Sequence, residues 1–447
     1  MTSDVVIVGA GVVGAAIACD LTRFELTCTL LEAGRDVGVG TSKANTALLH
    51  TGFDAKPGTL EARLVRRGYE LLSAYAPQAG IPIAAIGALL VAWDDEQLAA
   101  FPRIVAGARA NGYDTIRELD VDELYRREPQ LGPGARGALE VPDEGIVCPF
   151  TTPLAYATEA VLNGCELHRD TRVTGVERRG DGGFDVQTTG ETFATRYLVN
   201  AAGLRSDELN RLVGHDDFTV TPRRGELIVF DKLSRPLLRH IVLAVPTGTT
   251  KGVLVSPTVF GNLILGPTAE DIERKDDTSS TAAGLAYLRR EGERILPELL
   301  RHEVTAVYVG LRAATEHTDY QITIHAPEGY ACVGGIRSTG LTASLGIAEH
   351  VRTELEAAGL ELRPKPEPVS VSMPNIGELS PRPYEQGGRV VCFCERVTLA
   401  EIEAVLRSPI PPVDLDGLRR RTRVLMGRCQ GFYCGAHVAR LLQERPR

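Results

Sequence analysis

Apolar positions near the start of the chain fall into two runs separated by an amphipathic stretch. The first run covers residues 5–8, the amphipathic stretch extends to about Phe24, and the second run covers residues 27–31, just before Glu32. An unbroken apolar run of this kind is typical of a strand that is buried on both faces. A strand, a helix and a second strand in this order predict a βαβ unit.

Three glycines, Gly9, Gly11 and Gly14, follow the first strand at the spacing GxGxxG. In a dinucleotide-binding βαβ unit, the first glycine permits a tight turn, the second lets the backbone approach a pyrophosphate, and the third lets helix and sheet pack closely. The pyrophosphate then lies at the positive end of the helix, and Glu32 can accept hydrogen bonds from a ribose. Because the strand, the helix and the acidic residue all stand at the required distances, the motif predicts a dinucleotide site rather than only a glycine-rich turn.

The rest of the chain alternates between helical periodicity and short apolar runs. Helical spacing predicts helices at residues 59–79, 94–111, 119–131, 153–163 and 276–300. Apolar runs predict strands at residues 87–93, 219–230, 253–259, 262–265, 306–312 and 329–335, the last of which leads through a turn into a helix. Residues 142–152 are expected to form a loop, and the runs at residues 166–176, 183–188 and 192–200 predict a small antiparallel layer.

A proline-rich stretch separates the last of these elements from the end of the chain. Its prolines are Pro364, Pro366, Pro368, Pro374, Pro381 and Pro383. With little apolar periodicity, residues 360–388 predict a linker or an extended strap over the surface. The piece that follows has about sixty residues, which is short for a stable domain without a staple such as a metal.

Length and charge limit the class of protein. A chain of 447 residues exceeds what one core usually covers, so we expect two or three domains. The net charge of −9 excludes the basic footprint of a nucleic-acid-binding protein. The N-terminal residues lack a signal-peptide pattern, and no apolar stretch approaches the roughly 20 residues of a transmembrane helix. We therefore expect a cytoplasmic protein without a transmembrane segment, and we leave peripheral contact with the inner face of the membrane open.

The nine cysteines divide into two groups. The first five are scattered over apolar elements and are expected to be small buried residues. The last four cluster as Cys392-x-Cys394 and Cys429-x4-Cys434, which predicts a metal site in the short terminal piece rather than a chance grouping. Structural zinc is normally bound by CxxC pairs, whereas a [2Fe–2S] cluster takes four thiolates and tolerates a wider loop. The spacing favours the cluster, and zinc remains the alternative.

Two further segments contain candidate cofactor contacts. Residues 34–50 are rich in small and polar side chains, and Ser42, Lys43 and Asn45 either line a cofactor or belong to a solvent-exposed loop. The sequence NAAG at residues 200–203 ends an apolar run with small side chains. It suits either close approach to a flat ligand or a plain turn at the end of a strand.

With these motifs placed, residues 3–355 resemble the D-amino-acid-oxidase-like flavoproteins of the glutathione-reductase type. The resemblance is carried by the glycine motif with Glu32, by TSKANTALLHTGFDAKPGT at residues 41–59, by NAAG, and by GGIRSTGLTAS at residues 334–344. Within that family, the chain is most similar to the anaerobic-type glycerol-3-phosphate dehydrogenases and the L-2-hydroxyglutarate dehydrogenases. The terminal sequences CFCERVTLAEI and GRCQGFYC resemble the bacterioferritin-associated-ferredoxin-like [2Fe–2S] domain. Such a domain ends the glycerol-3-phosphate enzymes and related subunits of amino-acid and opine dehydrogenases.

The resemblance implies an α/β (α+β) fold with three parts. A Rossmann-like FAD-binding domain of the glutathione-reductase type would comprise residues 1–80, 150–215 and 325–360. An inserted antiparallel-sheet substrate domain would comprise residues 81–149 and 216–324. A linker at residues 361–388 would lead to a small C-terminal [2Fe–2S] domain at residues 389–447.

The resemblance also implies non-covalently bound FAD rather than NAD. Gly9, Gly11, Gly14 and Glu32 would hold the ADP half, with Val173 on the adenine side and Gly203 backing the cofactor. Ser42, Lys43 and Asn45 would lie along the pyrophosphate and the flavin ring. Gly335, Gly340, Leu341 and Thr342 would lie near the pyrimidine end of the ring, where a helix N-terminus stabilises negative charge. Cys392, Cys394, Cys429 and Cys434 would bind the cluster.

Substrate contacts follow from the same resemblance. Arg312 matches an arginine that binds the anionic group of the substrate, and its planar fork suits a carboxylate or a phosphate. His50 matches a histidine near the flavin, where a neutral imidazole can take the proton of the substrate hydroxyl. His317 is a weaker candidate. The alternatives are a surface ion pair for Arg312 and a structural role for His50.

The expected activity is therefore oxidation of a small anionic substrate by FAD, with electrons passed through the cluster to a quinone, a carrier protein or a partner subunit. The first candidate substrate is sn-glycerol 3-phosphate, followed by a 2-hydroxy acid such as L-2-hydroxyglutarate, and then by an amino acid or opine. Two departures leave the substrate open. The turn GGIRS has Arg337 in place of the lysine usual in glycerol-3-phosphate enzymes, and the hydroxyglutarate enzymes normally lack the cysteine module. A non-enzymatic subunit that only relays electrons or supports assembly is the alternative from another class, and a homo- or hetero-oligomer is open.

Overall fold

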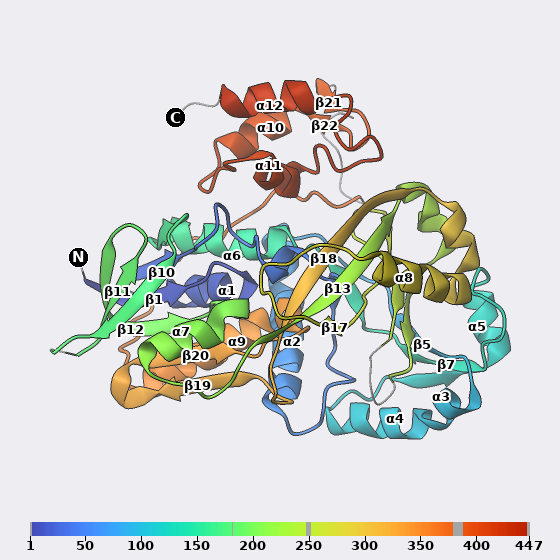
Figure 1. Ribbon diagram of the computed structural model, residues 1–447, viewed down its shortest axis with the longest axis horizontal. Coiled ribbons are helices and arrows are strands. Elements are labelled where there is room, and N and C mark those ends of the chain that lie inside the picture. The colour runs from blue at the N-terminus through green and yellow to red at the C-terminus, as the bar shows by residue number, and fades with distance from the viewer. Residues whose placement is uncertain (1, 181, 247–251, 379–387, 445–447) are drawn as a thin grey trace.

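The computed structural model describes residues 2–180, 182–246, 252–378 and 388–444. In these residues, two large sheets lie side by side, and a small helical module sits over them near the C-terminus (Figure 1). The α-helices are α1 (Val12–Leu21), α2 (Leu60–Gln78), α3 (Asp95–Ala99), α4 (Phe101–Ala110), α5 (Val121–Arg127), α6 (Thr151–Leu162), α7 (Ser206–Val213), α8 (Ala282–Ile295), α9 (Gly340–Ala357), α10 (Leu399–Leu406), α11 (Leu415–Thr422) and α12 (Gly435–Gln443). Short 3₁₀ helices are η1 (Thr41–Lys43), η2 (Gly203–Arg205), η3 (Lys232–Leu237), η4 (Pro297–Arg301) and η5 (Ala326–Glu328).

The first large sheet contains the predicted βαβ unit. Its strands are β1 (Thr2–Val8), β2 (Cys28–Leu31), β9 (Glu166–His168), β10 (Val173–Arg178), β11 (Phe184–Thr188), β12 (Thr192–Asn200), β19 (Gln321–His325) and β20 (Tyr330–Gly334). Strands β20, β12, β1, β2 and β9 pair in parallel. Residues 5–8 are fully or almost fully buried, as the apolar run predicts. Helix α1 packs against α6 and α9, and α9 packs against α2.

The predicted antiparallel layer at residues 166–200 is only partly correct. Strands β10, β11 and the first half of β12 pair antiparallel, but β9 pairs in parallel with β2 on the far side of the sheet. The second half of β12 pairs with β1. A three-residue strand such as β9 takes its partner from tertiary packing, because its own side-chain pattern is too short to specify one.

The second large sheet is mainly antiparallel. Its strands are β5 (Ala88–Ala92), β6 (Arg117–Leu119), β7 (Gly137–Val141), β13 (Thr221–Phe230), β14 (Ile241–Ala244), β15 (Leu254–Pro257), β16 (Leu263–Gly266), β17 (Glu270–Asp271) and β18 (Val304–Ala314). Strands β13 and β18 pair over their whole length, whereas β14 and β5 pair in parallel. The sheets agree with the expected α/β fold with an antiparallel insertion, although the predicted domain boundary at residue 324 falls inside β19 of the first sheet.

A small third sheet lies between these two and was not expected. It joins β3 (Leu48–Leu49), β4 (Ile83–Ala85) and β8 (Gly145–Val147) in antiparallel pairs. The prediction of a loop at residues 142–152 was therefore correct only in part, because β8 lies within the range and α6 begins at Thr151. Strands of two and three residues are too short to show the alternation from which a strand is predicted.

Two predicted helices are shorter or divided. The helix expected at residues 94–111 is split into α3 and α4, because Pro102 in the first turn of α4 has no amide hydrogen to continue the ladder. The helix expected at residues 276–300 starts only at α8, where the hydroxyl of Thr281 accepts a hydrogen bond from the amide of Gly284, and it ends before Pro297. Among the described residues, no helix is both long and apolar enough to cross a membrane.

Residues 361–378 run along the body as an extended strap. Backbone amides of Lys365, Met373 and Glu378 donate to carbonyls of Arg23, Ala79 and Val259. Residues 379–387, with the predicted linker prolines Pro381 and Pro383, lie outside the described residues. Beyond them, β21 (Val390–Cys392), β22 (Val397–Thr398) and helices α10 to α12 surround a small apolar core of their own.

A buried ion pair fixes this module to the body. The carboxylate of Asp36 accepts hydrogen bonds of 2.7 and 2.6 Å from Arg420 and Arg421 of α11, and all three side chains are at most 10% exposed. Burial alone would raise the pKa of Asp36, but the two guanidinium groups hold it below its ordinary value. The contribution of this ion pair to the stability of the folded protein is thus complete above about pH 4. It is lost as the pH falls through the lowered pKa of Asp36.

Replacing Asp36 by asparagine should weaken the docking of the module. Two buried guanidinium groups would then lack their counter-charge, which costs about 3–5 kcal/mol when one partner of a buried pair is removed. Calorimetry of the holoprotein should show a lower melting transition for the module. The control is Asp416→Asn, whose ion pair with Arg419 is exposed and contributes little. Equal decreases of the melting temperature in the two variants would contradict the proposed role of the buried ion pair.

Candidate active site and cofactor sites

A cavity of about 580 Å³ is lined by residues of both large sheets. Of the residues proposed from the sequence, it brings together Gly11, Ser42, Asn45, His50, Gly203, Arg312, Arg337, Gly340 and Leu341. The cavity lining does not include Gly9, Gly14, Glu32, Lys43, Val173, His317, Gly335 or Thr342. Part of the set predicted for the flavin ring and the substrate therefore gathers in one cavity, whereas Lys43, Gly335, Thr342 and His317 of that set lie outside its lining.

Two helix N-termini reach this cavity. Helix α1 begins beside Gly11 and helix α9 begins at Gly340, and both glycines line the cavity. Neither helix has an acidic side chain in its first turn. The positive ends of both helices are thus available to a pyrophosphate and to the negative charge of a reduced flavin.

The glycine motif has the geometry that its spacing predicts. Gly9 has a φ of +105°, and a Cβ there would lie 2.5 Å from the carbonyl oxygen of Ala201. A Cβ at Gly14 would lie 1.9 Å from the carbonyl oxygen of Gly9. The turn and the helix therefore pack at a distance that only glycine allows.

Glu32 has backbone partners at the end of β2. Its carboxylate accepts hydrogen bonds of 2.8 and 2.7 Å from the amides of Ala10 and Gly34, while burial raises its pKa. These bonds fix the carboxylate beside the glycine turn, where the ribose of a dinucleotide is expected. Val173 starts β10 of the same sheet and packs against the apolar cluster below it.

The three candidates of residues 42–45 point in different directions. The hydroxyl of Ser42 accepts a hydrogen bond of 2.8 Å from the amide of Val12 at the start of α1. Asn45 donates to the carbonyl of Ser42 and accepts from the amide of Ala47, which holds the segment in a tight turn at the cavity wall. Lys43 instead lies near Arg420 of the terminal module, and burial followed by this cation lowers its pKa.

His50 and Glu144 meet at the edge of the small sheet. The β3–β8 register pairs Leu49 with Gly145, so the next residues outward, His50 and Glu144, stand opposite each other. Nδ1 of His50 lies 3.3 Å from Oε2 of the fully buried Glu144. The other oxygen of Glu144 accepts from the amide and hydroxyl of Thr51, at 2.7 and 2.9 Å. A carboxylate held at this distance can stabilise a positive charge on the imidazole.

Arg312 faces the same cavity from β18. Its guanidinium donates to the carbonyl of Thr268 at 3.2 Å, and in the described residues it forms no ion pair with a carboxylate. Burial, with a contribution from nearby Arg223, lowers its pKa to about 10, so the group stays charged at neutral pH. An unpaired cation in a cavity wall is a natural partner for an anionic ligand group.

Arg337 and His317 are placed differently. Arg337 lines the cavity but already donates to Oε2 of Glu61 at 3.0 Å. His317 is exposed, with Nε2 lying 3.2 Å from the carbonyl oxygen of Asp217. Thr342 supports the site from behind, since its hydroxyl accepts from the amide of His50 at 3.0 Å.

The remaining glycine candidates lie in turns. Gly203 and Gly335 have φ values of +58° and +66°, which only glycine adopts without strain. A Cβ at Gly203 would meet no atom within 4 Å, so the cavity wall is open there.

The four terminal cysteines form two pairs. Cys394 interacts with Cys429 and also with Cys392, and Cys434 interacts with Cys392 and also with Cys429, so the two pairs lie close to each other. In the described residues, no three of these sulfur atoms lie within 4.8 Å of one another. A tetrahedral zinc would hold its four sulfurs about 3.8 Å apart, because each Zn–S bond is about 2.3 Å. The sulfur atoms are thus spaced more widely than a single tetrahedral zinc would hold them, and a [2Fe–2S] cluster also takes four thiolates.

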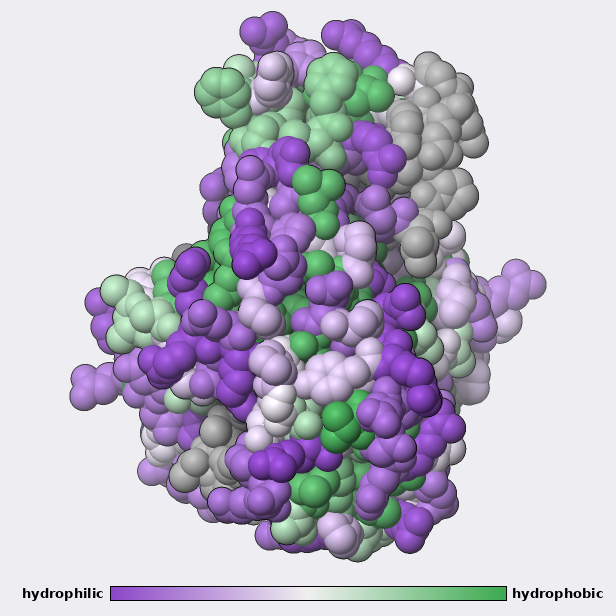
Figure 2. Space-filling view, turned by 90° about the vertical axis from the view of Figure 1, so that its right-hand side faces the viewer, coloured by the Kyte–Doolittle hydropathy of each residue, from purple (hydrophilic) through white to green (hydrophobic). Residues whose placement is uncertain are grey.

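Aromatic side chains surround these cysteines at the surface. Phe393, Phe432 and Tyr433 are 70%, 89% and 80% exposed, more than any other large apolar side chain in the described residues. Figure 2 shows such hydrophobic side chains at the top of the molecule, on the terminal module. The cysteine site thus opens to solvent through an apolar surface.

Comparison with known proteins agrees with this arrangement. Residues 4–353 match the family described as FAD dependent oxidoreductase. The chain belongs to this family. Residues 390–444 match the BFD-like [2Fe-2S] binding domain, which confirms the iron–sulfur prediction over the zinc alternative. The cofactors of this FAD-dependent oxidoreductase are thus FAD and a [2Fe–2S] cluster.

Individual relatives of the oxidoreductase carry related names. It is 33% identical to glycerol 3-phosphate dehydrogenase of Caloramator mitchellensis, over 98% of this chain and 93% of that protein. It is 26% identical to one of the subunits of the anaerobic glycerol-3-phosphate dehydrogenase of Escherichia coli, over 99% and 88% of the two chains. A reduced L-alpha-glycerophosphate oxidase from Mycoplasma pneumoniae with FAD bound superposes with a TM-score of 0.78 at 30% identity, over 83% of this chain and 98% of that chain.

Glu144 is the main site residue that the sequence did not reveal. It precedes the three-residue strand β8, and its distance of 94 positions from His50 carries no periodic signal. Tyr308 is another, since its hydroxyl donates to the carbonyl of Asn45 and holds the cavity wall to β18. Only the pairing of strands brings these groups together.

Replacing Gly14 by alanine should abolish FAD binding by the oxidoreductase. The new methyl group would press on the carbonyl of Gly9 and push α1 away from β1. The ratio of flavin to protein absorbance in the purified protein measures the loss. The control is Gly107→Ala in α4, where a Cβ meets no atom and should not disturb the flavin. Normal flavin content in Gly14→Ala would contradict this interpretation of the glycine motif.

Proposed function

We propose that this oxidoreductase oxidises sn-glycerol 3-phosphate to dihydroxyacetone phosphate. The observation that carries the proposal is the charged guanidinium of Arg312, which has no carboxylate partner in the described residues and lies in the same cavity wall as His50. Relatives named for glycerol 3-phosphate support the choice of substrate. FAD, when bound, supplies the acceptor for the hydride that leaves the substrate carbon.

Each protein group has a separate role in this proposal. Arg312 binds the phosphate by charge-assisted hydrogen bonds and so places the substrate in the cavity. His50 takes the proton of the substrate hydroxyl at Nε2, while Glu144 faces Nδ1 and stabilises the imidazolium that forms. Arg337 is bound to Glu61, so we assign the phosphate to Arg312 and not to the arginine of the GGIRS turn.

We further propose that electrons leave through a cluster held by Cys392, Cys394, Cys429 and Cys434. The terminal module is fixed to the body at Asp36, and its Arg420 lies near Lys43 of η1. The other two residues of η1, Thr41 and Ser42, line the cavity. The acceptor is then a quinone, a carrier protein or a partner subunit that reaches the surface of this module. The match to the BFD-like domain and the grouping of the four cysteines support this route.

Anaerobic titration of the flavin absorbance tests the substrate. Glycerol 3-phosphate should bleach the flavin band of the wild type, and L-2-hydroxyglutarate and amino acids should not. In Arg312→Gln, half-maximal bleaching should require about 10- to 100-fold more glycerol 3-phosphate. This is the loss of affinity expected when a hydrogen bond to a charged group is removed. Arg337→Gln is the matched control and should change little. Bleaching by a hydroxy acid or an amino acid, but not by glycerol 3-phosphate, would exclude glycerol 3-phosphate as the substrate. If no small molecule bleaches the flavin, the result would favour a non-catalytic relay subunit.

Kinetics of His50 and Glu144 variants test the proposed base. His50→Asn should lower kcat by about 10²–10⁴-fold, because positioned proton transfer contributes about that much. Glu144→Gln should also lower kcat, since an amide cannot stabilise an imidazolium as a carboxylate does. Flavin content and the KM for glycerol 3-phosphate should change little in both. An unchanged kcat in His50→Asn would exclude the histidine as the base.

A further inference from the structure

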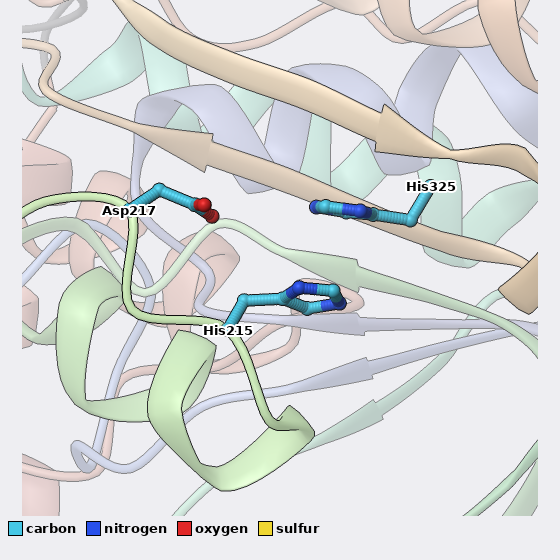
Figure 3. A group of neighbouring side chains, drawn as sticks. All are labelled: His215, Asp217 and His325. Atoms are coloured by element: carbon cyan, nitrogen blue, oxygen red, sulfur yellow. The ribbon is translucent and has the colours of Figure 1, made fainter.

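Two histidines and an aspartate meet at the edge of the first large sheet, away from both cofactor sites (Figure 3). His215 and Asp217 lie in the loop between α7 and β13, and His325 is the last residue of β19. One potential ligand atom from each residue lies within 4.8 Å of the other two. Figure 3 shows the carboxylate of Asp217 extending toward the two stacked imidazole rings. None of the three lines the cavity or belongs to the terminal module.

His215 has the outer partner that is typical of a metal-binding histidine. Its Nε2 lies 2.9 Å from Oε2 of Glu328. Glu328 also forms an ion pair with Arg178, which supplies a counter-charge for its carboxylate. A carboxylate there takes the Nε2 hydrogen of His215 and leaves the Nδ1 lone pair available. Such carboxylate–histidine pairs fix the tautomer and the direction of ligating imidazoles.

His325 contains a polar atom that the protein does not satisfy. Its Nε2 is buried and has no hydrogen-bond partner among the described residues. A buried polar atom without a partner is costly, and in native proteins it indicates a bound water or ion.

The two rings are close and nearly parallel. Their centroids are 3.7 Å apart, and their planes differ by 19°. The lone pairs of parallel rings do not converge on one point, so a shared cation requires rotation of at least one ring about its Cβ–Cγ bond. Asp217 sits on a surface loop beside them and can adjust to the same cation.

We propose that His215, Asp217 and His325 form a binding site for a divalent cation of the zinc type, with Glu328 supporting His215. Two imidazoles and one carboxylate suit a borderline first-row metal and leave a fourth position to water. The ion joins the loop that leads into β13 of the second sheet to the end of β19 of the first. It is thus a structural tie between the sheets that carry Arg312 and the FAD motif.

Zinc content of the holoprotein tests the site. Protein with FAD and its full iron complement is dialysed against low micromolar zinc chloride, and zinc, iron and flavin are measured together. The wild type should bind one more zinc per flavin than His325→Gln. His302→Gln, a histidine change at the end of η4 before β18, is the control and should keep that zinc. Equal iron and flavin in all three proteins shows that each is folded and that its cysteines are occupied.

A second variant separates a metal site from a simple polar cluster. Glu328→Gln should weaken zinc binding by about 10- to 100-fold, because the imidazole loses its supporting carboxylate. Zinc should raise the melting temperature of the wild type, and a chelator should reverse the rise, but neither should affect His325→Gln. Equal zinc content in the wild type and His325→Gln would overturn the proposal and leave a bound water as the partner of His325.

Discussion

The close contact of α1 with the turn after β1 determines where the chemistry of this protein takes place. Gly14 rests on the carbonyl of Gly9, so the helix starts immediately beside the sheet and directs its positive end into the cavity. Ser42 and Glu32 both bond to backbone amides of this junction. A side chain at either glycine would therefore displace the helix and also the loop and the carboxylate that depend on it.

The reactive part of the cavity is assembled from two different pairs of strands. Pairing of β3 with β8 sets His50 against Glu144, whereas pairing of β18 with β13 carries Arg312 from the second large sheet. Neither pair contains both the proposed base and the proposed anion-binding group. The cavity combines the two groups because it is lined by residues of both large sheets, and the hydroxyl of Tyr308 on β18 is bound to the carbonyl of Asn45 in the cavity wall.

The sequence predicted those features whose signals are local. The βαβ unit, α2, the long strands β13 and β18 and the terminal cysteine group each show a strong pattern within about thirty or forty residues. The resemblance to a flavoprotein family supplied Arg312 and His50. Features that depend on distant partners were missed or misplaced: Glu144 lies before a strand of three residues, and β9 pairs on the opposite side of the sheet from its neighbours in sequence. The direction of Lys43 depends on Arg420, which is far along the chain and belongs to another module. No short-range pattern contains such information.

The attachment of the terminal module has a consequence for the speed of the proposed relay. Asp36 forms buried salt bridges with two arginines of α11. The guanidinium of Arg423 lies 4.0 Å from the ring centroid of Phe260 in the body. A flavin and a cluster bound in this arrangement would keep a constant separation, unlike the centres of a tethered carrier that swings between two docking positions. The proposed electron transfer would then be tunnelling across a constant gap, and a higher solvent viscosity in glycerol or sucrose would leave its rate unaltered.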